Sequence, residues 1–200
     1  MISAVVLAAG ESTRMGFCKQ LLKIEGRTMI EQVVKNVRES RVDEVIVVLG
    51  FMANEIAEKL PRDQIKIIVN PRFKEGMSTS LKTGLEAVDR EADAVIFVLS
   101  DQPFIKPSII DKIIDEYERT GAPIVVPTYK GRRGNPVLFD MSLRAEVMNI
   151  QGDVGGRPII KKHEKEIREV EVGSPTILMD TDVKEDLEVL ERGDLDERHP

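Results

Sequence analysis

Short apolar runs, each followed by a polar turn and an amphipathic segment, constrain the fold of this 200-residue chain more than any other feature. The runs are rich in β-branched residues and almost uninterrupted by polar ones, which is typical of strands covered on both faces. They are Ser3–Ala8, Glu44–Leu49, Lys66–Val69, Ala94–Leu99 and Ile124–Val126. Strands that alternate with helices predict a three-layer α/β/α fold with a mostly parallel, Rossmann-like sheet.

Three segments between these runs have the pattern of helices. Thr28 and Glu31 form a capping-box pattern at the start of the first one. Ser78–Asp89 and Pro107–Thr120 have apolar residues at helical spacing, and a proline suits the first turn of a helix. We therefore expect helices that pack an apolar stripe against the sheet.

The rhythm of strand and helix weakens in the last third of the chain. Pro136–Phe139 and Ile167–Val172 predict short pairings that belong to an insertion at one edge of the sheet. Thr176–Met179 predicts a final strand, and a charged helix is expected near Lys184–Glu191.

Composition favours a soluble globular protein, with 42% hydrophobic and 32% charged residues. The longest apolar runs are strand-sized, well below the roughly 18 residues that a membrane span needs. The first residues lack a basic region, so we expect no signal peptide. No linker or repeat is visible, which predicts one domain over residues 1–192 and a solvated tail over residues 193–200.

Charge and rare residue types exclude several functions. The net charge of −6 disfavours binding to nucleic acid, because an acidic surface repels phosphodiesters. The single cysteine, Cys18, excludes an internal disulfide and fits a reducing compartment, so we expect a cytoplasmic protein. The histidines His163 and His199 are far apart, which leaves little for a zinc site or a Ser-His-Asp triad.

The loop Ala9–Gly16 follows the first predicted strand, at the end of a parallel sheet where ligands bind. Its glycines let the backbone approach a ligand and direct N–H groups at phosphate oxygens. Arg14 offers a planar fork for phosphate, and Lys19 adds a mobile charge. The loop is neither a Walker A motif nor G-x-G-x-x-G. We prefer a phosphate site here to the alternative, a solvated basic turn.

Carboxylates after two other strands predict a Mg²⁺ site, because this ion prefers hard oxygen ligands. Asp101 follows the predicted strand Ala94–Leu99, with only Ser100 between them. An aspartate at this place can also cap the next helix. Asp180 and Asp182 follow the last predicted strand and would share one face of it. We favour Asp182 as the closer metal ligand.

Three glycine-containing turns are further candidates for ligand contacts, and each has two possible interpretations. The turn at residues 76–80 either caps the next helix through Ser78 or contacts a ribose or base. The loops at residues 131–136 and 152–157 pair glycine with arginine. They are either plain surface loops or the site of an anionic second substrate.

These residues resemble a known family. LAAGESTRMGFCKQLL is similar to the signature of nucleotidyltransferases with the nucleotide-diphospho-sugar-transferase fold. Five further segments resemble the molybdenum cofactor cytidylyltransferase branch of the MobA-like group. They are NPRFKEGMSTSL, SDQP, YKGRRGNPVLF, GDVGGR and MDTDVKEDLEVL. The resemblance extends from Val5 to about Leu190. One departure is that Val183 and Lys184 follow Asp182, where the family commonly has Thr-Pro.

The resemblance implies a role for each candidate residue. The nucleotide would be contacted by Leu7, Ala8, Ala9, Gly10, Asn70 and Ser80. The triphosphate would be held by Arg14 and Lys19, and Mg²⁺ by Asp101 and Asp182. The acceptor would face Gly134, Asn135, Asp153 and Arg157.

The reaction implied by the resemblance is Mg²⁺-dependent transfer of CMP from CTP to the terminal phosphate of molybdopterin, with release of pyrophosphate. CTP is favoured because the related guanylyltransferases usually carry glycine where this chain has Ala9. A transient contact with the molybdoenzyme that receives the product is also expected. The alternatives are a sugar- or alditol-phosphate nucleotidyltransferase and a non-catalytic nucleotide sensor or cofactor chaperone.

Overall fold

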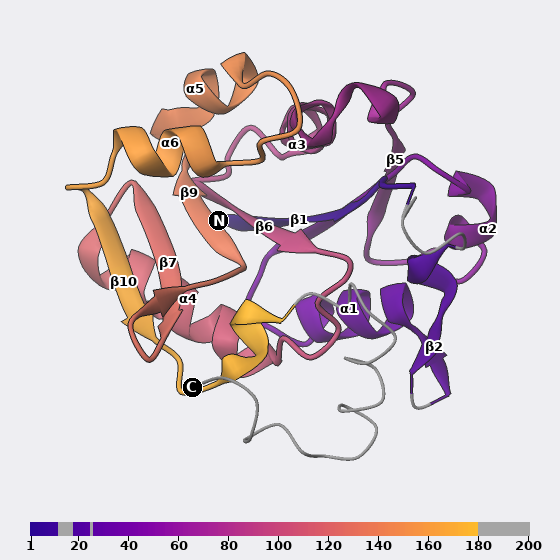
Figure 1. Ribbon diagram of the computed structural model, residues 1–200, viewed down its shortest axis with the longest axis horizontal. Coiled ribbons are helices and arrows are strands. Elements are labelled where there is room, and N and C mark those ends of the chain that lie inside the picture. The colour runs from indigo at the N-terminus through magenta and orange to yellow at the C-terminus, as the bar shows by residue number, and fades with distance from the viewer. Residues whose placement is uncertain (12–17, 25, 180–200) are drawn as a thin grey trace.

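A computed structural model describes residues 1–11, 18–24 and 26–179 of the chain (Figure 1). Its centre is an eight-stranded sheet with the order β10-β7-β9-β6-β1-β4-β5, to which β8 adds by pairing with β7. Four neighbouring strands run parallel, and β5 is the edge strand among them; they are β1 (Ile2–Ala8), β4 (Glu44–Leu49), β5 (Lys66–Val69) and β6 (Ala94–Leu99). These four match the strands that the apolar runs predict.

β7 (Ile124–Tyr129) matches the fifth predicted run and extends beyond it, and two-residue β8 (Arg132–Arg133) pairs with it. The prediction of an insertion at one edge was made for the segments that form β9 (Val137–Asp140) and β10 (Ile167–Glu171), and it is right only for the second of them. Only β10 lies at an edge, parallel to β7. β9 lies inside the sheet, antiparallel to both β6 and β7. The physical reason is burial, since Val137, Leu138 and Phe139 are apolar and all three are buried.

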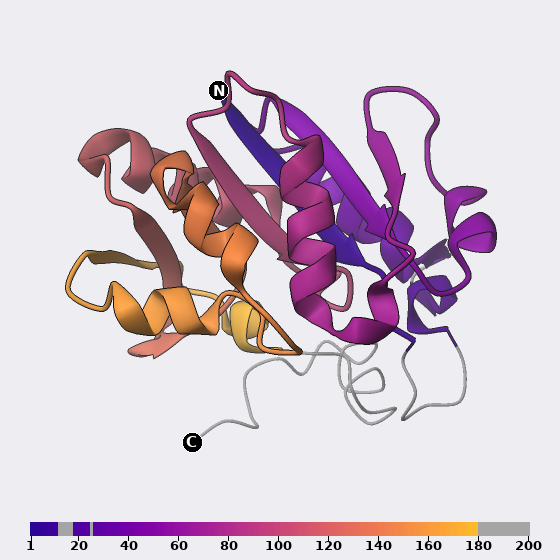
Figure 2. The same ribbon diagram turned by 90° about the horizontal axis from the view of Figure 1, so that it is seen from above.

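Helices cover both faces of the sheet and complete the three layers (Figure 1). On one face lie α1 (Met29–Arg38) and α4 (Pro107–Thr120), and on the other lie α3 (Met77–Ala87), α5 (Arg144–Asn149) and α6 (Arg157–Lys162). Short α2 (Ala53–Ala57) follows β4. Figure 2 shows α3 lying across the strands with α5 and α6 beside it. The fold is therefore the α/β/α arrangement that the sequence predicts.

The side chains on the two faces of β1 pack in separate hydrophobic cores, because successive side chains of a strand point to opposite faces. Val6 packs in the cluster that contains Ile30 of α1 and Ile110 of α4. Val5 packs in the cluster that contains Leu81 of α3 and Val147 of α5. The capping box at Thr28 is present, with the Glu31 carboxylate accepting from the Thr28 backbone N–H at 2.8 Å.

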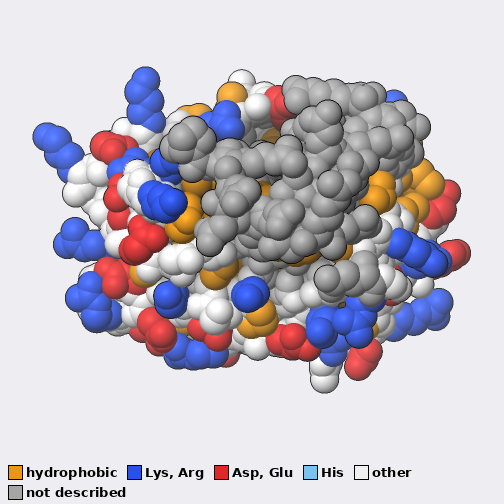
Figure 3. Space-filling view, turned by 60° about the horizontal axis from the view of Figure 1, so that its bottom comes forward, with side chains coloured by type: hydrophobic (Ala, Val, Ile, Leu, Met, Phe, Trp, Pro, Cys, Tyr) orange, Lys and Arg blue, Asp and Glu red, His pale blue; other side chains and the backbone are white. Residues whose placement is uncertain are grey.

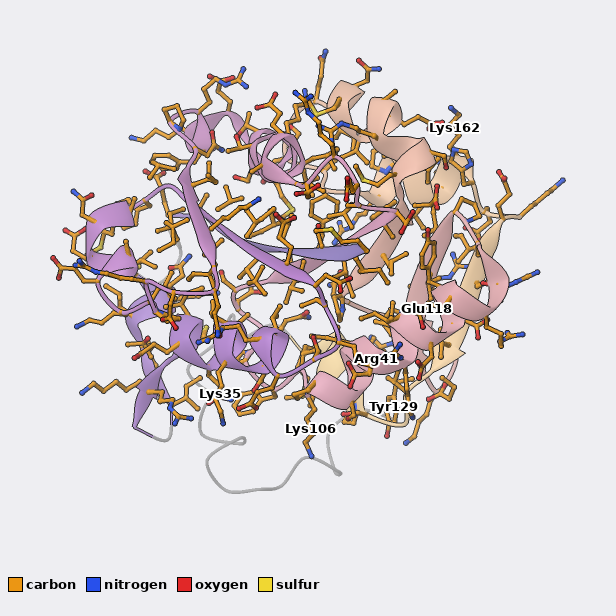
Figure 4. The ribbon with its side chains drawn as sticks, turned by 180° about the vertical axis from the view of Figure 1, so that it is seen from behind. Lys35, Arg41, Lys106, Glu118, Tyr129 and Lys162 are labelled. Carbon is orange, nitrogen blue, oxygen red and sulfur yellow. The ribbon has the colours of Figure 1, made fainter. Side chains whose placement is uncertain are left out.

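Ion pairs on the surface join the helices of one layer. Arg41, after α1, pairs with Glu118 on α4 at 2.9 Å (Figure 4). Both side chains are about half exposed, so the pair adds little stability. In Figure 3, basic and acidic side chains alternate around the visible surface outside the grey region. None of the helices that the structure describes is long and apolar enough to cross a membrane.

Several short elements connect this framework. They are η1 (Lys19–Leu21), β2 (Lys23–Ile24), β3 (Arg27–Thr28), η2 (Phe73–Glu75), η3 (Met141–Leu143) and η4 (Pro175–Leu178). The strand predicted at Thr176–Met179 is wrong, because these residues lie in and just after the 3-10 helix η4. Ser174 caps its first turn by accepting from the Thr176 N–H, and Pro175 lacks the N–H that a strand ladder would use. The predicted terminal helix and tail lie outside the described residues.

Candidate active site

A cavity of about 580 Å³ lies at the carboxyl ends of β1, β5 and β6. The register explains its place, because Leu7 pairs with Leu99 and Ala8 pairs with Leu49, so the parallel strands end at one level. Its walls combine residues from the first loop, η1, η2, the start of α3 and the turn after β6. They include Leu7, Ala9, Gly10, Glu11, Lys19, Gln20, Phe73, Lys74, Gly76, Met77, Ser80, Leu99, Ser100, Asp101 and Asp153.

Two backbone carbonyls just after β1 are held by hydrogen bonds from other segments around the cavity. The Ala9 carbonyl accepts from the Phe51 N–H at 3.2 Å. The Gly10 carbonyl accepts from Gln20 Nε2, also at 3.2 Å. Gln20 is buried and its Oε1 accepts from the Cys18 Sγ at 3.1 Å. These bonds fix the peptide planes of the loop beside the cavity.

Cys18 serves this framework rather than any nucleophilic chemistry. Burial raises the pKa of the Cys18 thiol, and the thiol donates to Gln20. A nucleophilic cysteine would need a lowered pKa. The Cys18 thiol is therefore unsuited to nucleophilic attack.

Lys19 brings a positive charge into the cavity wall. The residue is only 8% exposed, yet it is among those that line the cavity. A lysine in the wall of this cavity can place its ammonium beside a phosphate ligand. Arg14, the other predicted phosphate-binding cation, lies outside the described residues.

Ser80 lines the cavity, whereas Asn70 supports it from behind. Asn70 is 1% exposed and is not among the lining residues. Its Nδ2 donates to the hydroxyls of Thr79 and Ser80 at 2.8 and 3.0 Å, and its Oδ1 accepts from the Arg72 N–H at 2.9 Å. The structure thus gives Asn70 the place of a group that orients Ser80. Ala8 is likewise fully buried, with Leu7 and Ala9 exposed to the cavity beside it.

Asp101 lies in the turn after β6 and lines the cavity. The turn is held by a buried side chain of α1, Asn36, whose Nδ2 donates to the carbonyls of Pro103 and Ile105 at 2.9 Å each. Gln32 donates to the Asn36 Oδ1 at 2.8 Å and so fixes which way the amide points. The turn that carries Asp101 is therefore anchored to a helix far away in sequence.

The residues present fit a Mg²⁺ ion held together with a nucleotide. Mg²⁺ is usually bound by one or two carboxylates plus substrate phosphates and water, and Asp101 supplies such a carboxylate. Asp182, the second predicted ligand, lies outside the described residues, as does Asp180. Within the described ranges no cluster of three or more His, Cys, Asp or Glu side chains forms a metal site by itself.

A second cavity, of about 200 Å³, adjoins the first and shares Leu7, Met77, Leu99 and Asp153 with it. Its remaining walls are mostly apolar, and Phe97 and Phe139 meet there edge to face at 5.9 Å between ring centroids. The polar exceptions are Asn135, Asp153 and Arg157. Three of the four predicted acceptor-facing residues thus gather in one place.

The fourth, Gly134, has a packing role. A Cβ at this position would lie 2.3 Å from the Ile177 carbonyl oxygen, so only glycine lets the loop approach η4 this closely. The neighbouring Arg133 pairs with Glu164 at 2.8 Å and with Glu169 at 2.6 Å. It is therefore engaged away from the second cavity.

Comparison with known proteins identifies the family. The MobA-like NTP transferase domain matches residues 4–167 of this chain. The protein belongs to this family. It is a nucleotidyltransferase, in agreement with the resemblance of its motifs.

Two curated relatives of this MobA-like protein cover most of both chains. The molybdenum cofactor cytidylyltransferase of Escherichia coli (strain K12) is 27% identical over 186 residues, which are 92% of this chain and 93% of that protein. The nicotine blue oxidoreductase of Paenarthrobacter nicotinovorans is 27% identical over 173 residues, or 80% and 82% of the two chains.

Solved structures give the same picture of the fold. The homologue, from Mycobacterium sp. strain JC1, of Mycobacterium tuberculosis Rv0371c has a TM-score of 0.85 and 32% identity, with 96% of each chain covered. Rv0371c of M. tuberculosis H37Rv in complex with manganese has a TM-score of 0.81 and 28% identity, with 98% of each chain covered. The MobA-like chain therefore has the nucleotide-diphospho-sugar-transferase fold.

The structure adds cavity residues that motif reasoning did not select. Phe73 and Lys74, from η2, line the first cavity, and Lys74 lies 3.5 Å from Glu11 on the first loop. Asn36 holds the turn of Asp101 from outside the cavity, whereas Gln20 lines the cavity and holds the Gly10 carbonyl. The only signal for Phe73 and Lys74 is their place in NPRFKEG, directly after β5. Asn36 gives no such signal, because its partners lie far along the chain.

Proposed function

We propose that this MobA-like nucleotidyltransferase transfers CMP from CTP to the terminal phosphate of molybdopterin, with Mg²⁺ as its metal ion and pyrophosphate as the second product. One observation carries the proposal. A cavity with Lys19 and Asp101 in its walls adjoins an apolar cavity that holds Arg157, and Asp153 lines both. Such a pair suits a nucleoside triphosphate beside a phosphorylated acceptor with a flat ring system.

The chemistry asks for positioning and charge neutralisation rather than for a general base. The attacking acceptor phosphate oxygen is already anionic, and the bond from the α-phosphorus to the pyrophosphate oxygen breaks as the new bond forms. Mg²⁺, when bound through Asp101, supplies neutralisation of phosphate charge. Lys19 stabilises the negative charge that grows on the departing pyrophosphate. Ser80, oriented by Asn70, offers its hydroxyl to the nucleoside.

The choice of CTP rests on two supports. Ala9 stands where related guanylyltransferases usually carry glycine, and it lines the first cavity. The E. coli relative that matches 92% of this chain is named a cytidylyltransferase. We infer that the methyl group of Ala9 narrows the base site and favours the smaller pyrimidine.

The second cavity favours an acceptor with a flat ring, whose faces can lie against apolar groups, over a sugar phosphate. A bound sugar needs a hydrogen-bond partner for each buried hydroxyl, and unpaired ones are costly. The described walls offer polar side chains only at Asn135, Asp153 and Arg157, against aromatic and aliphatic groups elsewhere. A pterin can stack its ring faces against the apolar groups, direct its polar edge at Asn135 and leave its phosphate for Arg157. We expect the product to pass to a molybdoenzyme by transient contact.

Pyrophosphate release tests the proposal directly. Purified protein is incubated with Mg²⁺, molybdopterin and each of the four nucleoside triphosphates, and Asp101→Asn serves as the matched variant. We expect release with CTP, a product that contains CMP joined to molybdopterin, and loss of both in Asp101→Asn. Transfer to a sugar or alditol phosphate instead would overturn the acceptor assignment. Tight CTP binding without pyrophosphate release would favour a nucleotide sensor, and reduction of nicotine blue would favour the activity that the other relative's name states.

A further inference from the structure

A contact between two glycine-containing segments lies between the two cavities. The first N–H groups of α3 face the loop at residues 152–157, called here the acceptor loop. The Met77 N–H donates to Asp153 Oδ1 at 2.9 Å, and the Ser78 N–H donates to the Gly152 carbonyl at 3.2 Å. The residue before α3 is Gly76, which has no side chain to cap the helix. Asp153 therefore supplies the cap from more than 70 residues away.

Steric fit shows that this contact is built into both segments. A Cβ at Gly76 would lie 2.8 Å from the Gly152 carbonyl carbon and 2.9 Å from the Asp153 nitrogen. Gly76 also has a φ of +106°, which side-chain-bearing residues rarely adopt. On the other side, a Cβ at Gly155 would lie 3.0 Å from the Met77 Sδ. The acceptor loop thus seats directly on the start of α3.

This contact forms a wall that the two cavities share. Met77 and Asp153 line both of them, while the chain just before Met77 lines only the first. Arg157, the charged residue of the acceptor loop in the second cavity, lies four residues beyond Asp153. A displacement of the acceptor loop from α3 would therefore move Arg157 and the wall of the nucleotide cavity together.

We propose that Asp153 is a positioning residue that fixes the acceptor loop to α3 and thereby couples binding in the two cavities. This inference rests on the proposed function for the identity of the two ligands. One oxygen of the carboxylate is committed to the Met77 N–H, so Asp153 acts on the acceptor through the loop that it anchors. With the loop anchored, occupation of the first cavity pre-orders the second.

Two substitutions separate an anchoring hydrogen bond from a direct charge effect. Asp153→Asn keeps a side-chain oxygen that can accept from the Met77 N–H, whereas Asp153→Ala removes it. Lys161→Ala is the matched control, because Lys161 is exposed on α6 and is not among the lining residues of either cavity. Titration calorimetry measures molybdopterin affinity with and without Mg²⁺ and a CTP analogue in which CH₂ replaces the oxygen between the α- and β-phosphorus, so that no CMP is transferred during the measurement. Hydrogen exchange measures protection of the Met77 amide.

In the wild type and in Asp153→Asn we expect the unreactive CTP analogue to tighten molybdopterin binding by about tenfold. In Asp153→Ala this factor should fall towards one, and Met77 exchange should rise about tenfold. The inference is wrong if Asp153→Ala keeps the wild-type coupling, or if Asp153→Asn loses it while its Met77 amide stays protected. If the wild type binds no molybdopterin at all, the proposed function fails. Hydrogen exchange at the Met77 amide still tests the anchoring role of Asp153 in that case. Unchanged protection of this amide in Asp153→Ala would refute the role.

Discussion

Gly84 lies within α3 on the side that packs against the sheet, and Gly84→Ala should destabilise the protein. A Cβ at this position would lie 2.3 Å from Val5 Cγ1 on β1 and 3.1 Å from Val48 Cγ2 on β4. Both valines are fully buried. The new methyl group therefore forces the helix or the strands to move by about 1 Å to restore ordinary contact.

The expected magnitude comes from two opposing effects. Replacing glycine by alanine inside a helix stabilises by about 1 kcal/mol. Overpacking a close-packed core costs about 1–3 kcal/mol, and a contact this short belongs at the upper end of that range. The net loss should be about 1–2 kcal/mol, which corresponds to a fall in Tm of about 2–8 °C for a chain of this size.

Urea denaturation of four proteins measures this effect and its cause. They are the wild type, Gly84→Ala, Val5→Ala and the double variant. Val5→Ala removes the methyl groups that the new Cβ would meet, so the double variant should be more stable than the sum of the single effects by at least about 1 kcal/mol. A Gly84→Ala variant as stable as the wild type, or strict additivity in the double variant, would refute the steric reasoning.

Three further outcomes are expected. Lys19→Ala should slow turnover at least about a hundredfold, because a lost cation costs on the order of 3–4 kcal/mol in the transition state, and near-normal single-turnover rates would contradict this. Asn36→Asp keeps the shape of the side chain but removes the two N–H groups that anchor the turn of Asp101. Mn²⁺ affinity, measured by electron paramagnetic resonance, should therefore fall about tenfold, while CTP binding without metal changes little. An equal loss of both affinities would indicate general unfolding. His163 contacts Glu166 at 2.8 Å and Glu146 at 3.1 Å, and these hydrogen bonds raise its pKa. The charged form of His163 therefore stabilises the fold below the ordinary histidine pKa, and this stabilisation disappears as pH rises through the raised pKa. His163→Gln should lose most stability near pH 5.5 and little at pH 9. A stability difference between wild type and variant that stays constant with pH would contradict the raised pKa of His163.

The sequence by itself determined the layers of the fold and most of the nucleotide side of the site. A central strand of a parallel sheet is buried on both faces, so its consecutive residues are apolar. Ala94–Leu99 is such a run, and it can therefore be recognised from the sequence. The parallel order then brings Gly10, Ser80 and Asp101 to one rim, and all three line the first cavity. Helix boundaries followed from local chemistry, such as the capping box at Thr28.

Only the tertiary structure decided what depends on partners far away in the chain. Ser174 and Pro175 turn an apolar run into η4, while β9 finds its place between β6 and β7 through pairing that no local pattern encodes. Asn70 orients Ser80 behind the cavity, where the motif alone suggested a ligand contact. Asp153 caps a helix more than 70 residues away. A residue type states which bonds a side chain can make, whereas the folded chain decides which of its possible partners lies within reach.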